Sequence, residues 1–107
     1  IWDDTGLIGF AICHYGKGSE AAKGNCYVKL GAAKSAEAFE RLIDECEALA
    51  TILGMSSLVA GVDTACVDAY HRMIARKFRI QSLSVSMHKP NQTGYSRPDV
   101  YVIEDRR

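Results

Sequence analysis

The first third of the chain alternates between apolar runs and short polar turns. Residues 7–13 are almost wholly apolar, which predicts a buried strand. The turn at 4–6 ends in glycine and predicts a hairpin that pairs this strand with a first one at 1–4. Residues 25–30 alternate with period two and predict a third strand. Its predicted inner face carries Cys26, Val28 and Leu30.

The pattern then changes to a helical period. Ser35 is the predicted N-cap, Glu37 places a carboxylate in the first turn, and Gly54 is the predicted C-terminal stop. Between them, the apolar positions recur every three or four residues over about five turns, which predicts an amphipathic helix. The predicted buried face consists of Phe39, Leu42, Ile43, Cys46, Leu49, Ala50 and Leu53.

The pattern of apolar and polar residues in the second half of the chain predicts one more helix and three strands. Residues 58–62 are apolar on both faces, which suggests a central strand covered on both sides. A second helix follows with Asp63 or Thr64 as its cap. Residues 81–88 alternate as a strand with one polar face, 89–98 form a polar loop, and 99–104 contain a last strand. The second helix should bury Val67, Tyr70, Ile74 and Phe78.

The predicted order is β-β-β-α-β-α-β-β within a single domain, residues 1–107. Because a helix connects the strands at 25–30 and 57–62, these two should be parallel, whereas the hairpin partners should be antiparallel. The expected fold class is therefore α/β, or α+β, with a mixed β-sheet and two helices.

Composition and charge exclude several classes of function. Of 107 residues, 13 are basic and 13 acidic, so the net charge is zero and predicts neither a nucleic-acid partner nor a membrane surface. No apolar stretch is long enough for a membrane span. The four cysteines form no C-x-x-C pair, so no metal site is expected, and we expect reduced, mostly buried thiols in a cytoplasmic protein.

Three segments together resemble the later part of the GNAT fold, the Gcn5-related N-acetyltransferases. Residues 3–10 resemble the hairpin of that family, 39–54 its long cofactor-side helix, and 69–78 its "A-x-x-x-Y-x-x-x-G-F" segment. The resemblance implies an acyl-CoA N-acyltransferase fold that lacks its N-terminal strand and helices. The start at Ile1 fits such an incomplete domain, for example the second half of a two-domain protein.

The resemblance also places a cofactor site. In this family acetyl-CoA lies in the splay between the two parallel strands, and a Q/R-x-x-G-x-G/A loop at the start of the long helix holds its pyrophosphate on backbone N–H groups. That loop falls on residues 34–39, with Lys34, Ser35 and Ala36 as the cofactor-binding candidates. Glu37 and Phe39 replace its two small residues, adding a repelling carboxylate and bulk.

The second family site is altered as well. The position of an Asn that contacts CoA falls on Cys66, and the position of the Tyr that protonates the leaving thiolate falls on Met73. Met73 has no proton to donate, and Lys77 replaces the family's glycine. Tyr70, one turn earlier, is the remaining catalytic candidate, with a plain core position as the alternative.

Two further features have both a functional and a structural interpretation. The basic cluster at the end of the second helix would suit the 3′-phosphate of CoA or an acidic partner, but cations also favour any helix C-terminus. The loop at 88–98, with Asn91, Tyr95 and Arg97, would help to form an acceptor site or is a long hairpin connection. The basic cluster consists of His71, Arg72, Arg76, Lys77 and Arg79.

The function expected from these observations is a structural or regulatory half of a larger N-acetyltransferase, with degenerate acetyl-CoA motifs. Such a half would pair with a catalytic GNAT domain or with a copy of itself as a homodimer. The first alternative is an active N-acetyltransferase in which a small amine attacks acetyl-CoA directly. The second alternative is a small-molecule-binding module without chemistry.

Overall fold

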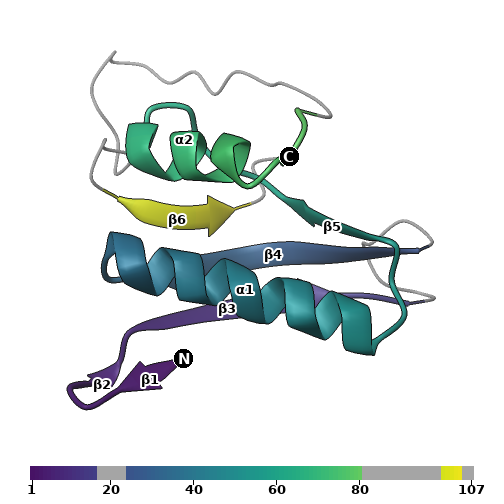
Figure 1. Cartoon of the computed structure of the whole chain (residues 1–107), viewed down its shortest axis with the longest axis horizontal. Helices are drawn as coiled ribbons and strands as arrows, with labels where there is room; N and C mark the ends of the chain where they lie inside the picture. The colour runs from purple at the N-terminus through teal and green to yellow at the C-terminus, as the bar shows by residue number, and fades with distance from the viewer. Residues whose placement is uncertain (17–23, 81–99, 105–107) are drawn as a thin grey trace, which may run out of the picture.

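A computed structural model describes residues 1–16, 24–80 and 100–104 of the chain. A mixed sheet carries two helices, and a small hairpin precedes it (Figure 1). This agrees with the expected α+β class. The elements are β1 (Trp2–Asp3), β2 (Gly6–Leu7), β3 (Gly9–His14), β4 (Asn25–Ala33), α1 (Ala36–Ile52), β5 (Ser57–Ala60), α2 (Val67–Ala75) and β6 (Tyr101–Glu104).

The N-terminal hairpin is confirmed, but it is smaller than predicted. β1 pairs antiparallel with β2 through a turn in which Gly6 has a φ of 121° and Asp3 Oδ1 accepts a hydrogen bond from Thr5 N–H at 2.7 Å. The predicted strand at 7–13 is divided at Ile8, and β3 pairs with β4 rather than with the first strand. The first strand therefore contributes nothing to the main sheet.

β4 is the central strand of the main sheet. One of its edges pairs with β3 from Tyr27 to Ala33, in antiparallel orientation. The other edge pairs with β5 in parallel orientation from Asn25 to Val28, and then with β6 in antiparallel orientation from Leu30 to Ala33. Figure 1 shows β5 and β6 on the same side of β4. The predicted parallel pair around the long helix is thus confirmed.

A bulge in β4 overturns one part of the predicted strand pattern. Ile12 pairs with Leu30, but Cys13 pairs with Val28, so the register skips Lys29. The extra residue turns Leu30 to the opposite face of the sheet from Val28. Leu30 is 40% exposed whereas Val28 is fully buried, although strict alternation placed both on one face.

The long helix forms as predicted because its signals are local. Ser35 is the N-cap, and its Oγ accepts a hydrogen bond from the Ala38 N–H at 3.1 Å. Gly54 follows the helix with a φ of 72°, in the left-handed conformation that favours glycine. The buried face consists of Ala38, Phe39, Leu42, Ile43, Cys46 and Ala50. The prediction was wrong for Leu49, which is 36% exposed, and Leu53 is only half-buried at the C-cap.

The second helix is rotated from its predicted orientation. Its N-cap is Cys66, and Asp63 instead caps the turn before it, accepting from the Ala65 N–H at 2.8 Å. Ala69 and Met73 are buried. The predicted inner residues Val67 and Ile74 are each 43% exposed, because a neighbouring stripe of the helix, with Ala69 and Met73, faces the core instead.

Both helices pack on the same face of the sheet and share one core. That core consists of Val28, Phe39, Ile43, Cys46, Cys66, Ala69, Met73 and Ile103. The other face is more open than predicted, since Phe10 and Ile12 of β3 are exposed and β5 is only half-buried. The predicted strand at 81–88 and the loop at 89–98 lie outside the described residues.

Candidate functional site

The cofactor candidates Lys34, Ser35 and Ala36 lie where β4 passes into α1. Lys34 is exposed, and its backbone N–H donates to the Ile8 carbonyl at 2.9 Å. Ser35 and Ala36 are half-buried. The Ser35 hydroxyl already accepts a hydrogen bond from the Ala38 N–H, so one of the free N–H groups in the first turn of α1 has a partner within the chain. The expected position at a helix N-terminus is thus confirmed, whereas anion binding there is not tested by this geometry.

The two replaced loop positions differ in their surroundings. Glu37 is exposed in the first turn of α1, where its carboxylate suits the helix dipole. Phe39 is fully buried, and its ring centroid lies 5.7 Å from that of Tyr101 on β6. Phe39 therefore serves as a core residue that joins α1 to β6.

β6 follows β5 along the same edge of β4. The pairing of β4 with β5 ends at Val28 and Ala60, and from Leu30 onward β4 hydrogen-bonds to β6. The Glu104 N–H donates to the Gly61 carbonyl at 3.0 Å, so that β6 also contacts the chain just after β5. A β-carbon at Gly61 would overlap with the Glu104 carbonyl oxygen. Glycine thus permits the close approach of these two backbones.

The two candidate residues on α2, Tyr70 and Met73, differ in burial. Met73 belongs to the core, whereas Tyr70 is half-buried with its ring centroid 5.7 Å from that of His71. In the described part of the chain, no hydrogen bond or ring contact joins Tyr70 to the residues at the start of α1. The structure therefore does not bring Tyr70 into contact with the cofactor candidates.

Lys77 occupies a backbone conformation that suits glycine. Its φ is 74°, and it directly follows Arg76, the C-cap of α2. The Phe78 N–H donates to the Met73 carbonyl at 3.1 Å, which closes the helix end. The position that the resemblance assigns to the family's glycine thus has the geometry of a glycine.

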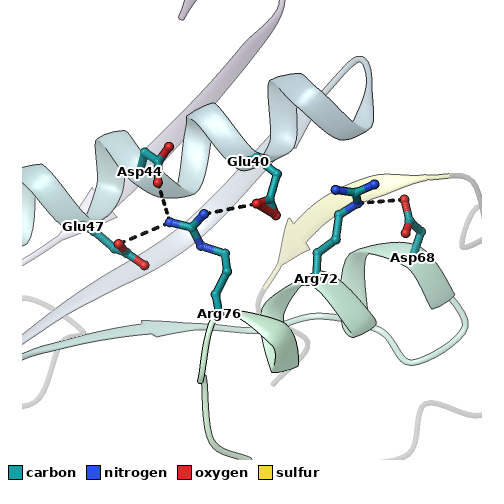
Figure 2. A network of polar contacts seen from close by, with 6 residues as sticks. All are labelled: Glu40, Asp44, Glu47, Asp68, Arg72 and Arg76. Carbon is teal, nitrogen blue, oxygen red and sulfur yellow. Dashed lines mark hydrogen bonds and ion pairs between the residues drawn. The ribbon is translucent and has the colours of Figure 1, made fainter.

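Acidic side chains of α1 neutralise part of the basic cluster. The Arg76 guanidinium lies 3.2 Å from Glu40, 2.5 Å from Asp44 and 3.2 Å from Glu47 (Figure 2). These three carboxylates project from one face of the helix toward the end of α2, at i, i+4 and i+7. Each charged group taken alone has the pattern of a solvated surface, so the sequence carries no signal for their pairing.

A second ion pair links α2 with β6. The Arg72 Nε lies 2.9 Å from Asp68, and the same Asp68 oxygen accepts a hydrogen bond from the Tyr101 hydroxyl. The hydrogen bonds from Tyr101 and Arg72 lower the pKa of Asp68, and the bond to Asp68 raises the pKa of Tyr101. Asp68 therefore stays ionised at neutral pH.

Arg76 is held as a cation in a partly desolvated position. Burial acts to lower its pKa, but the hydrogen bonds that the guanidinium donates to Asp44 and Glu47 outweigh this effect and raise the pKa. Arg72 and Arg76 thus have carboxylate partners within the chain, and the exposed members of the basic cluster are His71, Lys77 and Arg79. The structural interpretation of the cluster, as an ion-paired helix end, is supported for these two arginines.

The described residues contain neither a metal-site arrangement nor a helix suited to crossing a membrane. Within 1–16, 24–80 and 100–104, no group of His, Cys, Asp or Glu is arranged to hold a metal ion. Over the same residues, no helix has both the length and the apolar character required to cross a bilayer.

Comparison of the chain with protein-family models, curated protein sequences and solved structures finds no match. The assignment to a family consequently rests on the short motifs and on the order of the elements.

Proposed function

We propose that this chain is a GNAT-like domain that serves as a structural or regulatory half of a larger N-acetyltransferase and does not itself hold acetyl-CoA. The observation that carries the proposal is the position of β6. The family's cofactor lies in the splay between the two parallel strands, and here β6 hydrogen-bonds along β4 from Leu30 to Ala33 in that place. A strand in this position uses the backbone groups that would otherwise face a ligand.

The start of α1 supports the same conclusion. A pyrophosphate there would face the Glu37 carboxylate, and the two negative charges repel each other. Phe39 supplies a side chain where the family pattern has a small residue, and this ring is committed to the core against Tyr101. Removing the ring to make room would open a cavity between α1 and β6.

The missing proton donor argues against independent catalysis. Met73 stands at the position of the family's tyrosine and is buried among apolar residues. Tyr70 is the nearest alternative on α2, but it lies beside His71. An acetyl transfer by this chain alone would therefore lack the family's usual general acid.

The exposed apolar residues on the outer face of the sheet favour the proposal that a partner domain binds there. Phe10 and Ile12 of β3 and Leu30 of β4 are exposed on the face opposite the helices. In the described residues β3 pairs with another strand on one edge only, and a strand edge of this kind can take up a further strand. A catalytic GNAT domain or a second copy of this chain would cover both features.

The test of the proposal is an isothermal titration of acetyl-CoA into the 107-residue chain, with a thermal-shift assay beside it. The expected result is no heat and no change of Tm up to millimolar ligand. Micromolar binding, equivalent to about −8 kcal/mol, would overturn the proposal. In that case the alternative of an active N-acetyltransferase becomes the leading one, and turnover with a panel of amines is measured next.

Lys34→Ala is the matched variant for that titration. Lys34 is exposed at the start of α1, so its replacement leaves the core unchanged. If acetyl-CoA binds and Lys34→Ala weakens it, the ligand lies at the predicted helix N-terminus. Binding that is unchanged in Lys34→Ala would place the ligand elsewhere on the domain.

A further inference from the structure

β3 forms one edge of the main sheet (Figure 1). It pairs with β4 on one side, and no strand among residues 1–16, 24–80 and 100–104 pairs with its other side, which we call the β3 edge. Proteins commonly protect such an edge with lysine, proline or a bulge. β3 contains neither lysine nor proline, and the bulge of this sheet lies in β4. The β3 edge is therefore suited to pairing with a further strand.

The hydrogen bonds at the start of β3 show which backbone groups point toward the β3 edge. The Lys34 N–H, directly after β4, donates to the Ile8 carbonyl at 2.9 Å. The Ile1 ammonium donates to the Gly9 carbonyl at 2.7 Å. Because successive peptide groups of a strand point in alternate directions, the Gly9 carbonyl points away from β4. The same alternation directs the N–H and C=O groups of the second and fourth residues after Gly9, at positions 11 and 13, toward the β3 edge.

Ile1 occupies the first position along the β3 edge. Besides its bond to Gly9, its carbonyl accepts a hydrogen bond from the Ile8 N–H at 3.0 Å. A further strand therefore has to pair with residues 10–14. The backbone groups available to it are those of Ala11 and Cys13, on either side of Ile12.

We propose that the β3 edge is the contact between two copies of this chain, which pair in antiparallel orientation about a two-fold axis at Ile12. In this register Ala11 lies opposite the partner's Cys13, and Cys13 lies opposite the partner's Ala11. The two pairs exchange four backbone hydrogen bonds, and Ile12 lies opposite the partner's Ile12. The contact rests on the proposed function only in its choice of partner, a second copy in place of a catalytic domain.

The side chains suit this register. Phe10 and Ile12 are 43% and 49% exposed on the face opposite the helices, and Ile12 pairs with Leu30 of β4. At the axis, Ile12 and Leu30 of both copies join into one apolar patch. On the other face the opposed residues are Ala11 and Cys13, which are small enough to let the two backbones approach. β3 carries no Asp, Glu, Lys or Arg, so the pairing sets no like charges opposite each other.

The contact is small for a dimer. The paired segment, residues 10–14, is about 17 Å long. Specific and stable interfaces bury about 1,200–2,000 Å² in total, which is more than one pair of short strands provides. Association through the β3 edge should therefore be weak, reversible and dependent on protein concentration.

Sedimentation equilibrium under reducing conditions, from about 10 μM to about 1 mM protein, tests the association in a range that covers weak complexes. The mean mass of the wild type should rise from that of one chain toward that of two. Ile12→Lys should remain a monomer, because it places two like charges opposite each other at the axis. Ile12 is about half exposed, so the variant keeps its core, and thermal unfolding checks this.

A wild type that stays monomeric at every concentration would overturn the proposal and leave the β3 edge to a different partner. Dimerisation of Ile12→Lys at the wild-type level would place the contact elsewhere and also overturn it. Neither measurement uses acetyl-CoA, so failure of this proposal is distinct from failure of the proposed function.

Ile12→Cys tests the register. Opposed residues that do not hydrogen-bond to each other have α-carbons about 4.5 Å apart, which is within the range of a disulfide. Oxidised glutathione should therefore convert Ile12→Cys into a disulfide-linked dimer, with the bond located by peptide mass spectrometry. Phe10→Cys is the matched control, since it lies on the same face with similar exposure.

In the proposed register the two copies of residue 10 lie about 13 Å apart along the strands. Phe10→Cys should therefore stay unlinked, as should the wild type, whose four native cysteines control for background. Equal cross-linking of Phe10→Cys and Ile12→Cys, or no cross-link in Ile12→Cys, would contradict a two-fold axis at Ile12.

Discussion

The guanidinium of Arg76 lies 2.5 Å from the carboxylate of Asp44, which ties the C-terminal end of α2 to the middle of α1. The arginine side chain is largely buried, at 18% exposure, whereas Asp44 is mostly in solvent. Glu40 and Glu47 lie on either side of Asp44 and complete the contact (Figure 2). One cation therefore holds three carboxylates that would otherwise repel one another.

Arg76→Met should destabilise the domain by about 1–3 kcal/mol, because three acidic side chains lose their shared partner while the side-chain volume is kept. Equilibrium urea unfolding measures this. Arg72→Met is the control, since its single ion pair with Asp68 is more exposed and more screened by solvent, so that its loss should lower the free energy of unfolding less. An equal loss of unfolding free energy in Arg76→Met and Arg72→Met would contradict the central role of Arg76.

Lys77→Gly should stabilise the domain by about 1 kcal/mol. The positive φ of Lys77 is strained for a residue with a β-carbon and costs glycine nothing. Thermal unfolding should show a higher Tm for Lys77→Gly, whereas Lys77→Ala, which keeps the β-carbon, should differ little from wild type. A higher Tm in both variants would mean that loss of the lysine charge, and not relief of backbone strain, stabilises the domain.

Gly61→Ala should detach β6 from the end of β5. The added β-carbon would meet the Glu104 carbonyl oxygen, and that oxygen belongs to the backbone and cannot simply turn away. We expect a loss of at least about 1 kcal/mol of stability. Hydrogen exchange should show faster exchange at the Glu104 amide, with the Ala38 amide at the start of α1 unchanged as an internal control. Unchanged protection at Glu104 would argue against the close approach.

Stability should fall as pH rises above about 9 under reducing conditions. The Cys46 thiol ionises near pH 9 in the unfolded chain but only at about 12 when folded, owing to burial and to Cys13, Cys26 and Glu45 nearby. The unfolded state thus loses a proton first, and the stabilisation present below pH 9 is lost between 9 and 12.

Urea unfolding of wild type and Cys46→Ala at pH 7, 9 and 10 isolates this effect. Other groups titrate in the same pH range, so the relevant quantity is the difference in the free energy of unfolding between wild type and Cys46→Ala at each pH. Because Cys46→Ala has no thiol to ionise there, the wild type should lose about 1 kcal/mol more between pH 9 and 10. Parallel pH profiles would show that Cys46 ionises normally in the folded state.

Local chemistry alone determined much of the fold. Ser35 caps α1 through its own hydroxyl, Gly6 and Gly54 occupy positive-φ positions, and the apolar spacing between 38 and 50 selects the buried face. Each of these depends on residues a few positions apart. The parallel pairing of β4 and β5 also follows from the chain, since a helix connects them. The position of Lys34, Ser35 and Ala36 at a helix N-terminus was predictable for the same reason.

Tertiary packing decided the rest. The register skip at Lys29 moved Leu30 to the outer face, and period-two patterning carries no signal for one inserted residue. The buried stripe of α2 followed from how the helix is rotated against α1 and β6, so Ala69 and Met73 are buried in place of Val67 and Ile74. The partners of Arg76 and the pairing of β6 with β4 beyond the end of β5 join segments more than thirty residues apart. Such choices depend on how whole elements fit together, because the free energy of a distant contact is set by packing and not by the neighbouring sequence.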